Sequence, residues 1–107
     1  MKILFCSDIE KIAQHKILEI YPDLKADIII APHHGSTVTT DTAFIERLEP
    51  KIIIYSGGQA QYENQMKITH QKAVRLFTFD SGQIVLNISS KGNITFNTFL
   101  KAKKQPR

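Results

Sequence analysis

The sequence contains a single cysteine, Cys6, so no disulfide can form within the chain. A chain without disulfides is typical of a reducing compartment. Cys6 lies in the apolar run KILFC, and we expect it to be buried as a small hydrophobic side chain rather than to act as a nucleophile.

Long apolar runs are absent as well. No stretch approaches the roughly 18 residues that a membrane-spanning helix needs. The first residues also lack the order of a signal peptide, in which a basic segment, an apolar segment and a cleavage site follow one another. These absences predict a soluble chain with no transmembrane segment.

The composition that remains is that of an ordinary globular domain. The 107 residues suit one domain, with 42% hydrophobic and 22% charged residues. The formal net charge is +4, and four basic residues lie in the final stretch KAKKQPR. We interpret residues 1–100 as the domain and residues 101–107 as a basic, flexible tail. The charge permits an anionic partner without identifying one.

The stretch at residues 28–36, IIIAPHHGS, organises the rest of the chain. A run of isoleucines is typical of a strand that is buried on both faces, as in a parallel sheet. Pro32 cannot donate to a sheet ladder, so the strand should end there. His33 and His34 then lie at the carboxyl end of a strand, where open α/β sheets bind their ligands.

Strands and helices alternate along the chain. Buried strands are predicted at residues 2–6, 26–31 and 51–55. A helix should follow the first strand, with Ser7 and Glu10 as a capping box, and another should follow the second, capped by Thr40 or Asp41 and ended by Pro50. This alternation predicts parallel pairing and an α/β fold.

The last part of the chain is expected to hold a third helix and a hairpin. The polar residues 59–67 are interpreted as a loop, Thr69 as the cap of a third helix, and residues 77–79 as a short strand. Residues 83–89 and 93–100 alternate in polarity around a turn at residues 90–92, which predicts antiparallel strands added at an edge of the sheet. The complete order is β-α-β-α-β-α-β-β with a terminal hairpin.

Two strand ends carry residues that bind metals. Asp8 follows the first strand, and His33 and His34 follow the second. Because successive parallel strands end at the same edge of a sheet, these side chains should converge. A carboxylate with imidazoles can bind a divalent metal. Equally, Asp8 can serve as a helix cap and the histidines as a polar loop.

The segments LFCSDIE, LKADIIIAPHHGS and LEPKIIIYSGG resemble the C-terminal half of hydrolases with the metallo-β-lactamase fold. The likeness is greatest to the C-terminal domain of the ComEC/Rec2 DNA-internalisation competence proteins. It extends from Ile3 to about Ile84, and residues 26–36 with residues 8–10 are its most specific parts. It implies half of an αββα sandwich in a bacterial protein, either cytoplasmic or attached to a membrane protein in a longer parent.

The resemblance also implies roles for individual residues. Asp8 matches the aspartate that binds or bridges metal in these hydrolases. His33 and His34 match the histidine pair of the HHGS motif, one of which is a ligand, and Gly35 and Ser36 shape that loop. The implied cofactor is a divalent ion, zinc or manganese.

The departures from the family pattern limit what this chain can do. The stretch KITH keeps only the final histidine of the family's GHPH sequence, so His70 is either a substrate-binding or proton-transfer residue or a histidine at a helix start. The main metal motif, His-x-His-x-Asp-His, is absent from the 107 residues. Since a catalytic zinc needs three protein ligands, we expect poor metal binding by this chain alone.

Three functions remain open. The first is a part of a metal-dependent nuclease in DNA uptake, inactive alone. The second is a non-catalytic α/β interaction module or degenerate remnant, and the third, ranked lower, is a fragment of a small-molecule metallo-hydrolase. Half of a sandwich leaves sheet surface uncovered, so we also expect either a homo-oligomer or a partner that supplies the missing N-terminal half.

Overall fold

The computed structural model describes residues 1–37, 41–68 and 71–98. Within them no helix combines the length and apolar character needed to cross a bilayer. The elements are, in chain order, β1 (Ile3–Phe5), α1 (Lys11–Ile20), β2 (Ile28–Ile30), the 3₁₀ turn η1 (Pro32–Gly35), α2 (Thr42–Leu48), β3 (Ile52–Tyr55), α3 (Gln59–Met66), β4 (Val74–Phe77), α4 (Thr78–Ser81), β5 (Ile84–Ile88) and β6 (Ile94–Thr98).

The predicted α/β fold is confirmed. The first four strands form one parallel sheet in the order β1-β2-β3-β4, with Ile29 of β2 in register with Leu4 of β1 and Ile53 of β3. Because side chains alternate along a strand, each isoleucine run supplies residues to both faces of the sheet. Both faces of its centre are buried: Ile28 on one face and Ile29 on the other are 0% exposed.

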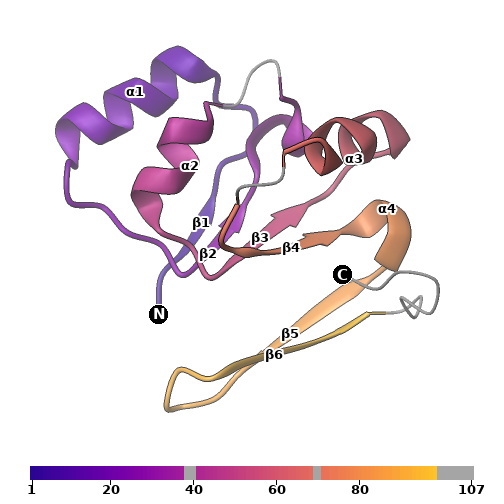
Figure 1. Cartoon of the computed structure of the whole chain (residues 1–107). Helices are drawn as coiled ribbons and strands as arrows, with labels where there is room; N and C mark the ends of the chain where they lie inside the picture. The colour runs from indigo at the N-terminus through magenta and orange to yellow at the C-terminus, as the bar shows by residue number, and fades with distance from the viewer. Residues whose placement is uncertain (38–40, 69–70, 99–107) are drawn as a thin grey trace.

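Each face packs against a different partner (Figure 1). Helices α1 and α2 lie over one face, where Ile29 and Ile53 join a core with Phe44 and Leu48 of α2. The hairpin of β5 and β6 lies over the other face, where Ile28 packs in a cluster that also contains Ile52, Leu76, Ile84, Leu86 and Ile94. The molecule therefore has three layers, with the parallel sheet in the middle.

The position of the hairpin corrects one prediction. Strands β5 and β6 pair antiparallel, as expected, but they form a separate sheet rather than extending an edge of the parallel one. One face of the hairpin carries a row of apolar side chains that includes Ile84 and Leu86. These side chains are removed from water by packing against the face of the parallel sheet, which an edge position would not achieve. The half-sandwich architecture implied by the resemblance remains a proposal.

The prediction of the third helix was wrong in its location. The helix is α3, Gln59–Met66, in the segment interpreted as a loop, and Val74–Phe77 is the fourth parallel strand. The Gly58 N–H donates to the Gln61 side chain at 3.1 Å and begins the helix. The spacing of apolar residues around Ala73 suits a helix, but this segment forms a strand instead. Its pairing with β3 buries Leu76 and Phe77, which stabilises the strand. The predicted cap Thr69 lies outside the described residues, as does the tail at 101–107.

Helix starts were predicted with mixed success. Asp41 caps α2, accepting a hydrogen bond from the Ala43 N–H at 2.9 Å. The capping box of Ser7 and Glu10 is not formed, because α1 begins only after Glu10 and Ser7 has a left-handed backbone with φ of 51°. Cys6 is buried as expected, and burial raises the pKa of its thiol to about 11.

Candidate functional site

The loops that follow the parallel strands meet at one edge of the sheet. The turn at Ser7 and Asp8 follows β1, η1 follows β2, and the Ser56–Gly58 turn follows β3. Tyr55 and Phe77 lie side by side at this end of β3 and β4, with stacked rings whose centroids are 4.6 Å apart. The η1 turn packs against the Tyr55 ring of this pair.

His33 joins η1 to the turn after β1. Its backbone N–H donates to the Ser7 carbonyl at 2.9 Å, and its ring Nε2 lies 2.7 Å from the Asp8 carbonyl oxygen. A carbonyl oxygen only accepts hydrogen bonds, so Nε2 carries the hydrogen. In the neutral imidazole, Nδ1 then keeps its lone pair. A Glu10 carboxylate oxygen lies 3.9 Å from the same Nε2.

His34 makes the equivalent contact on the other side of η1. Its Nδ1 lies 2.6 Å from the Ser56 carbonyl oxygen, so Nδ1 carries the hydrogen and Nε2 keeps the lone pair. The side chain is exposed and borders a narrow hollow that is lined by aromatic residues, among them Tyr62 and Phe79. Each histidine therefore has one nitrogen fixed by a backbone carbonyl and one with a lone pair.

The backbone of η1 is strained. His33 and His34 have φ of 48° and 55°, a region that non-glycine residues rarely adopt, and Gly35 follows with φ of 86°. A Cβ on Gly35 would come within 2.5 Å of a ring carbon of Tyr55, so the turn rests closely on that ring. The buried Gln65 side chain donates to the Gly35 carbonyl at 2.7 Å. Successive strained residues that are held by their surroundings are common at functional sites.

Ser36 completes this turn. Its N–H donates to the His33 carbonyl at 2.9 Å, which closes the loop on itself. Sequence reasoning placed Gly35 and Ser36 in the loop but did not find Gln65 or Ser56. A glutamine within a polar segment gives no signal of burial, and Ser56 acts through its carbonyl, which every residue has.

Asp8 and His33 are in contact, as predicted, but Asp8 makes this contact with its backbone. Asp8 is exposed, and its contact with His33 is made by the carbonyl rather than by the carboxylate. Among the described residues there is no group of three or more histidine, cysteine, aspartate or glutamate side chains placed to bind one metal ion. Asp8, His33 and His34 therefore do not form a three-ligand site as they stand. His70 lies outside the described residues.

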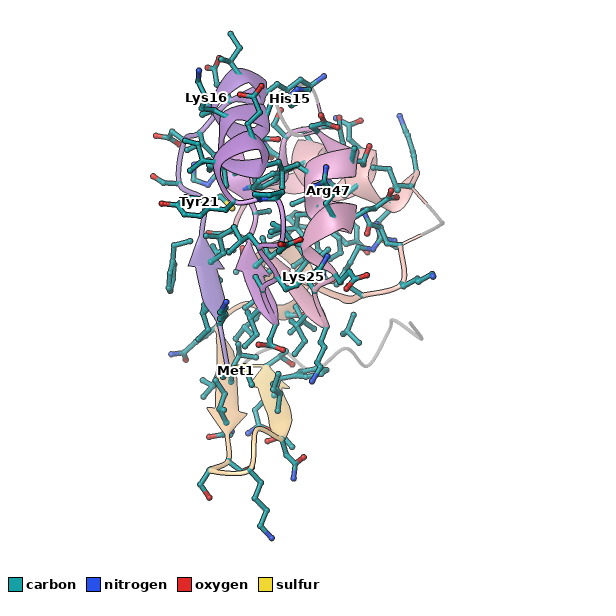
Figure 2. All side chains as sticks on the ribbon, turned by 90° about the vertical axis from the view of Figure 1, so that its left-hand side faces the viewer. Met1, His15, Lys16, Tyr21, Lys25 and Arg47 are labelled. Atoms are coloured by element: carbon teal, nitrogen blue, oxygen red, sulfur yellow. The ribbon has the colours of Figure 1, made fainter. Side chains whose placement is uncertain are left out.

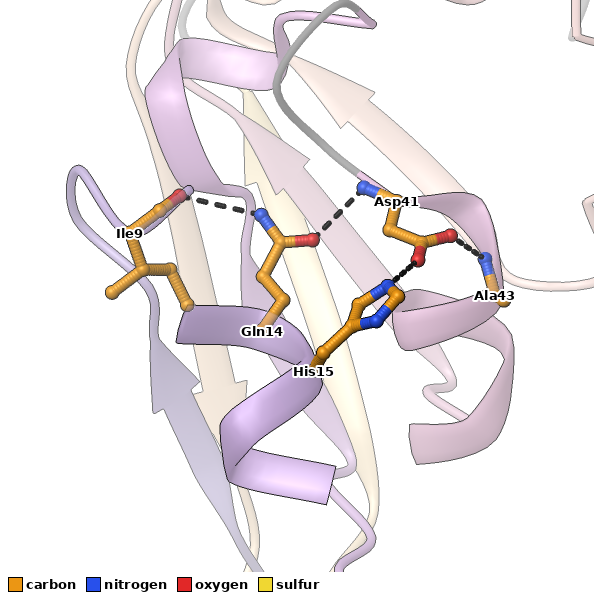
Figure 3. A network of polar contacts seen from close by, with 5 residues as sticks. All are labelled: Ile9, Gln14, His15, Asp41 and Ala43. Atoms are coloured by element: carbon orange, nitrogen blue, oxygen red, sulfur yellow. Dashed lines mark hydrogen bonds and ion pairs between the residues drawn. The ribbon is translucent and has the colours of Figure 1, made fainter. Parts of the chain in front are cut away.

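A second polar network, drawn in Figure 3, connects the two helices on the same side of the sheet. His15 Nε2 lies 2.5 Å from an Asp41 carboxylate oxygen, and the buried Gln14 side chain accepts from the Asp41 N–H at 2.8 Å. The hydrogen bond from His15, and after it the one from the Ala43 N–H, lowers the pKa of Asp41. His15 had no partner at a recognisable sequence spacing, so this contact was not predicted.

These features define an α/β domain with a histidine-bearing turn at the carboxyl edge of a parallel sheet. The chain is 32% identical over 96 residues to ComE operon protein 3 of Bacillus subtilis (strain 168), which covers 90% of this chain and 12% of that protein. It is 29% identical over 97 residues to the uncharacterized protein YcaI of Escherichia coli (strain K12), which covers 84% of this chain and 13% of that protein.

The match is thus nearly complete for this chain and small for its relatives, since the chain spans only 12% and 13% of their lengths. No protein-family model matches the sequence. No solved structure matches the fold. The likeness therefore concerns a segment of much longer proteins.

Proposed function

We propose that this chain is part of a ComEC/Rec2-like domain of the metallo-β-lactamase fold, which hydrolyses phosphodiester bonds of DNA during uptake. Three observations support the proposal. The first is the similarity to ComE operon protein 3. The second is the parallel sheet with α1 and α2 on one face, which is the arrangement that half of an αββα sandwich would have. The third, and the one that carries most weight, is the pair of oriented histidines in η1.

The orientation of these imidazoles favours a metal-binding role. Metal-binding histidines usually donate their second ring N–H to a carbonyl or carboxylate, which fixes the tautomer and directs the other nitrogen at the metal. His33 and His34 both have this arrangement, to Asp8 and to Ser56. The left-handed backbone holds it at the cost of strain, and such strain is retained where the surroundings enforce it.

The donors fit a zinc or manganese ion in kind but not in number. Asp8, His33 and His34 are suitable ligand types, yet the described residues hold no group of three. The His-x-His-x-Asp-His motif that would supply the others is not in the sequence. We therefore propose that this chain contributes one wall of the site and does not hydrolyse DNA alone. His70 stays a candidate for proton transfer or substrate binding.

A non-catalytic interaction module is the second candidate. It is favoured by the same shortage of ligands among the described residues. In that case η1 would be a structural turn whose histidines serve only to connect β1, β2 and β3 through their carbonyl contacts. The two candidates differ in whether the free nitrogens of His33 and His34 bind metal.

A zinc titration followed by NMR of the histidine rings separates them. The proposal expects Zn²⁺ to shift the His33 or His34 ring signals at submillimolar concentration, and Asp8→Ala to weaken this binding. His15 is a matched internal comparison, because one of its ring nitrogens is likewise held, by the Asp41 carboxylate, but the residue belongs to α1 rather than to η1. If Zn²⁺ at millimolar concentration leaves the ring signals of His33 and His34 unchanged, or shifts them no more than those of His15, the chain is a non-catalytic interaction module.

A further inference from the structure

Strand β1 is an edge of the parallel sheet, and no strand in the described part of the chain pairs with its outer side. The Lys2 carbonyl accepts from the Ile28 N–H, and the Cys6 N–H donates to the Ile30 carbonyl, both at 3.2 Å. Because backbone groups alternate in direction along a strand, Ile3 and Phe5 direct their N–H and C=O groups away from β2. The hairpin belongs to a separate sheet and does not pair with this edge.

The side chains at this edge are apolar and exposed. Ile3 and Phe5 are in register with Ile28 and Ile30, so they belong to the sheet face that the hairpin covers. The hairpin buries Ile28, but Ile3 remains 43% exposed and Phe5 73% exposed. In Figure 2, β1 is the leftmost strand of the sheet, with Met1 below it. An open strand edge beside exposed apolar side chains readily pairs with another strand.

We propose that the occupant of this edge is a second copy of the chain, whose β1 pairs antiparallel with the first. A register centred on Leu4 places Ile3 opposite Phe5 of the partner subunit, and Phe5 opposite the partner's Ile3. Each such pair exchanges two backbone hydrogen bonds, so all four outward-directed groups on each strand are satisfied. The opposed side chains form aromatic–aliphatic pairs across the interface, which stabilise antiparallel strands.

Charge complementarity selects this orientation. The strand has the basic residue Lys2 at its start and the acidic residue Asp8 just beyond its end, both exposed. Antiparallel pairing brings Lys2 opposite the partner's Cys6, two residues from the partner's Asp8, while the parallel alternative would align like charges. Like charges directly opposite each other are destabilising. The interface is self-complementary, as a two-fold dimer requires, and gives a continuous sheet in the order β4-β3-β2-β1-β1-β2-β3-β4.

Sedimentation velocity of the full chain across micromolar concentrations tests the dimer. We expect a concentration-dependent dimer for the wild type and its loss in Phe5→Asp. Ile12→Asp is the matched control, since Ile12 is an 84% exposed apolar residue of α1 rather than of β1, and the substitution should leave the dimer intact. A monomer at the highest concentration would overturn the proposal and would leave the edge to polypeptide outside this chain. Equal effects of the two substitutions would also overturn it.

Two further measurements test the register. The amides of Ile3 and Phe5 should exchange with solvent more slowly in the dimer than after dilution to monomer. Lys2→Glu should weaken association, and the double variant Lys2→Glu/Asp8→Lys should restore it, because the charges are then exchanged. Failure of the double variant to recover, or protection at another strand instead of β1, contradicts antiparallel β1 pairing. Neither result depends on metal binding by η1.

Discussion

The two faces of the parallel sheet differ in how completely they are covered. On the helix-covered face, Ile29 and Ile53 are 0% exposed. On the hairpin-covered face, Ile28 is 0% exposed, but Phe5 of β1 is 73% exposed and Val74 of β4 is 48% exposed. The two-stranded hairpin is too narrow to cover all four strands of the parallel sheet. The helix face therefore holds the stable core and supports η1, while the hairpin face leaves surface for association.

The largest difference between the faces should appear on truncating matched isoleucines. Ile53→Ala removes a fully buried side chain from the helix-side core and should lower the free energy of unfolding by about 4 kcal/mol. Ile3→Ala removes a side chain that is 43% exposed and should cost less than about 1 kcal/mol. Urea denaturation of dilute, monomeric protein measures both.

The comparison would fail if the two substitutions cost the same. A large effect of Ile3→Ala in the monomer would mean that the hairpin covers β1 more fully than its exposure indicates. Repeating the measurement at high concentration sharpens the result, because the cost of Ile3→Ala should then rise if β1 lies in a dimer interface.

Two glycines with the same backbone angle extend the comparison to the turns. Gly35 and Gly92 both have φ of +86°, but a Cβ on Gly35 would lie 2.5 Å from the Tyr55 ring, whereas one on Gly92 meets nothing within 4 Å. Gly35→Ala should therefore cost about 3 kcal/mol, from backbone strain and overpacking together. Gly92→Ala should cost about 1 kcal/mol, from strain alone.

Thermal unfolding monitored by circular dichroism compares the two variants directly. Equal losses would mean that the Tyr55 ring moves aside without cost and that η1 is not held closely against the sheet. Because His34 precedes Gly35, the ring signals of His34 should also move in Gly35→Ala and stay unchanged in Gly92→Ala.

Sequence reasoning worked where a local pattern has one structural solution. Three isoleucines in a row can be buried only between two layers, so β2 and β3 were located correctly. Parallel connectivity then placed the turn after β1 near His33. It failed where residues distant in the sequence decide the local structure. Val74 belongs to a strand because β4 can pair with the edge of β3. The hairpin lies on a sheet face because its apolar side chains are buried there. Ring nitrogen roles also depend on such partners, so they could not be predicted.

The smallest expected effect concerns how the helix layer is held together. Asp41 contacts His15 of α1 while capping α2, and these contacts lower its pKa in the folded state. A carboxyl group with a lowered pKa stabilises the fold above its unfolded pKa of about 3.9, and this contribution is lost as the pH falls through the folded value. Asp41→Asn keeps a capping oxygen but no charge, so it should cost no more than about 1 kcal/mol near neutral pH.

Urea titrations between neutral and strongly acidic pH measure this effect. The stability curves of the wild type and Asp41→Asn should converge as Asp41 becomes protonated, because both side chains are then neutral. Asp23→Asn, in the exposed loop before β2, is the matched control and should follow the wild type throughout. A constant gap between wild type and Asp41→Asn at every pH would show that the hydrogen-bond geometry, rather than the charge on Asp41, holds α1 against α2.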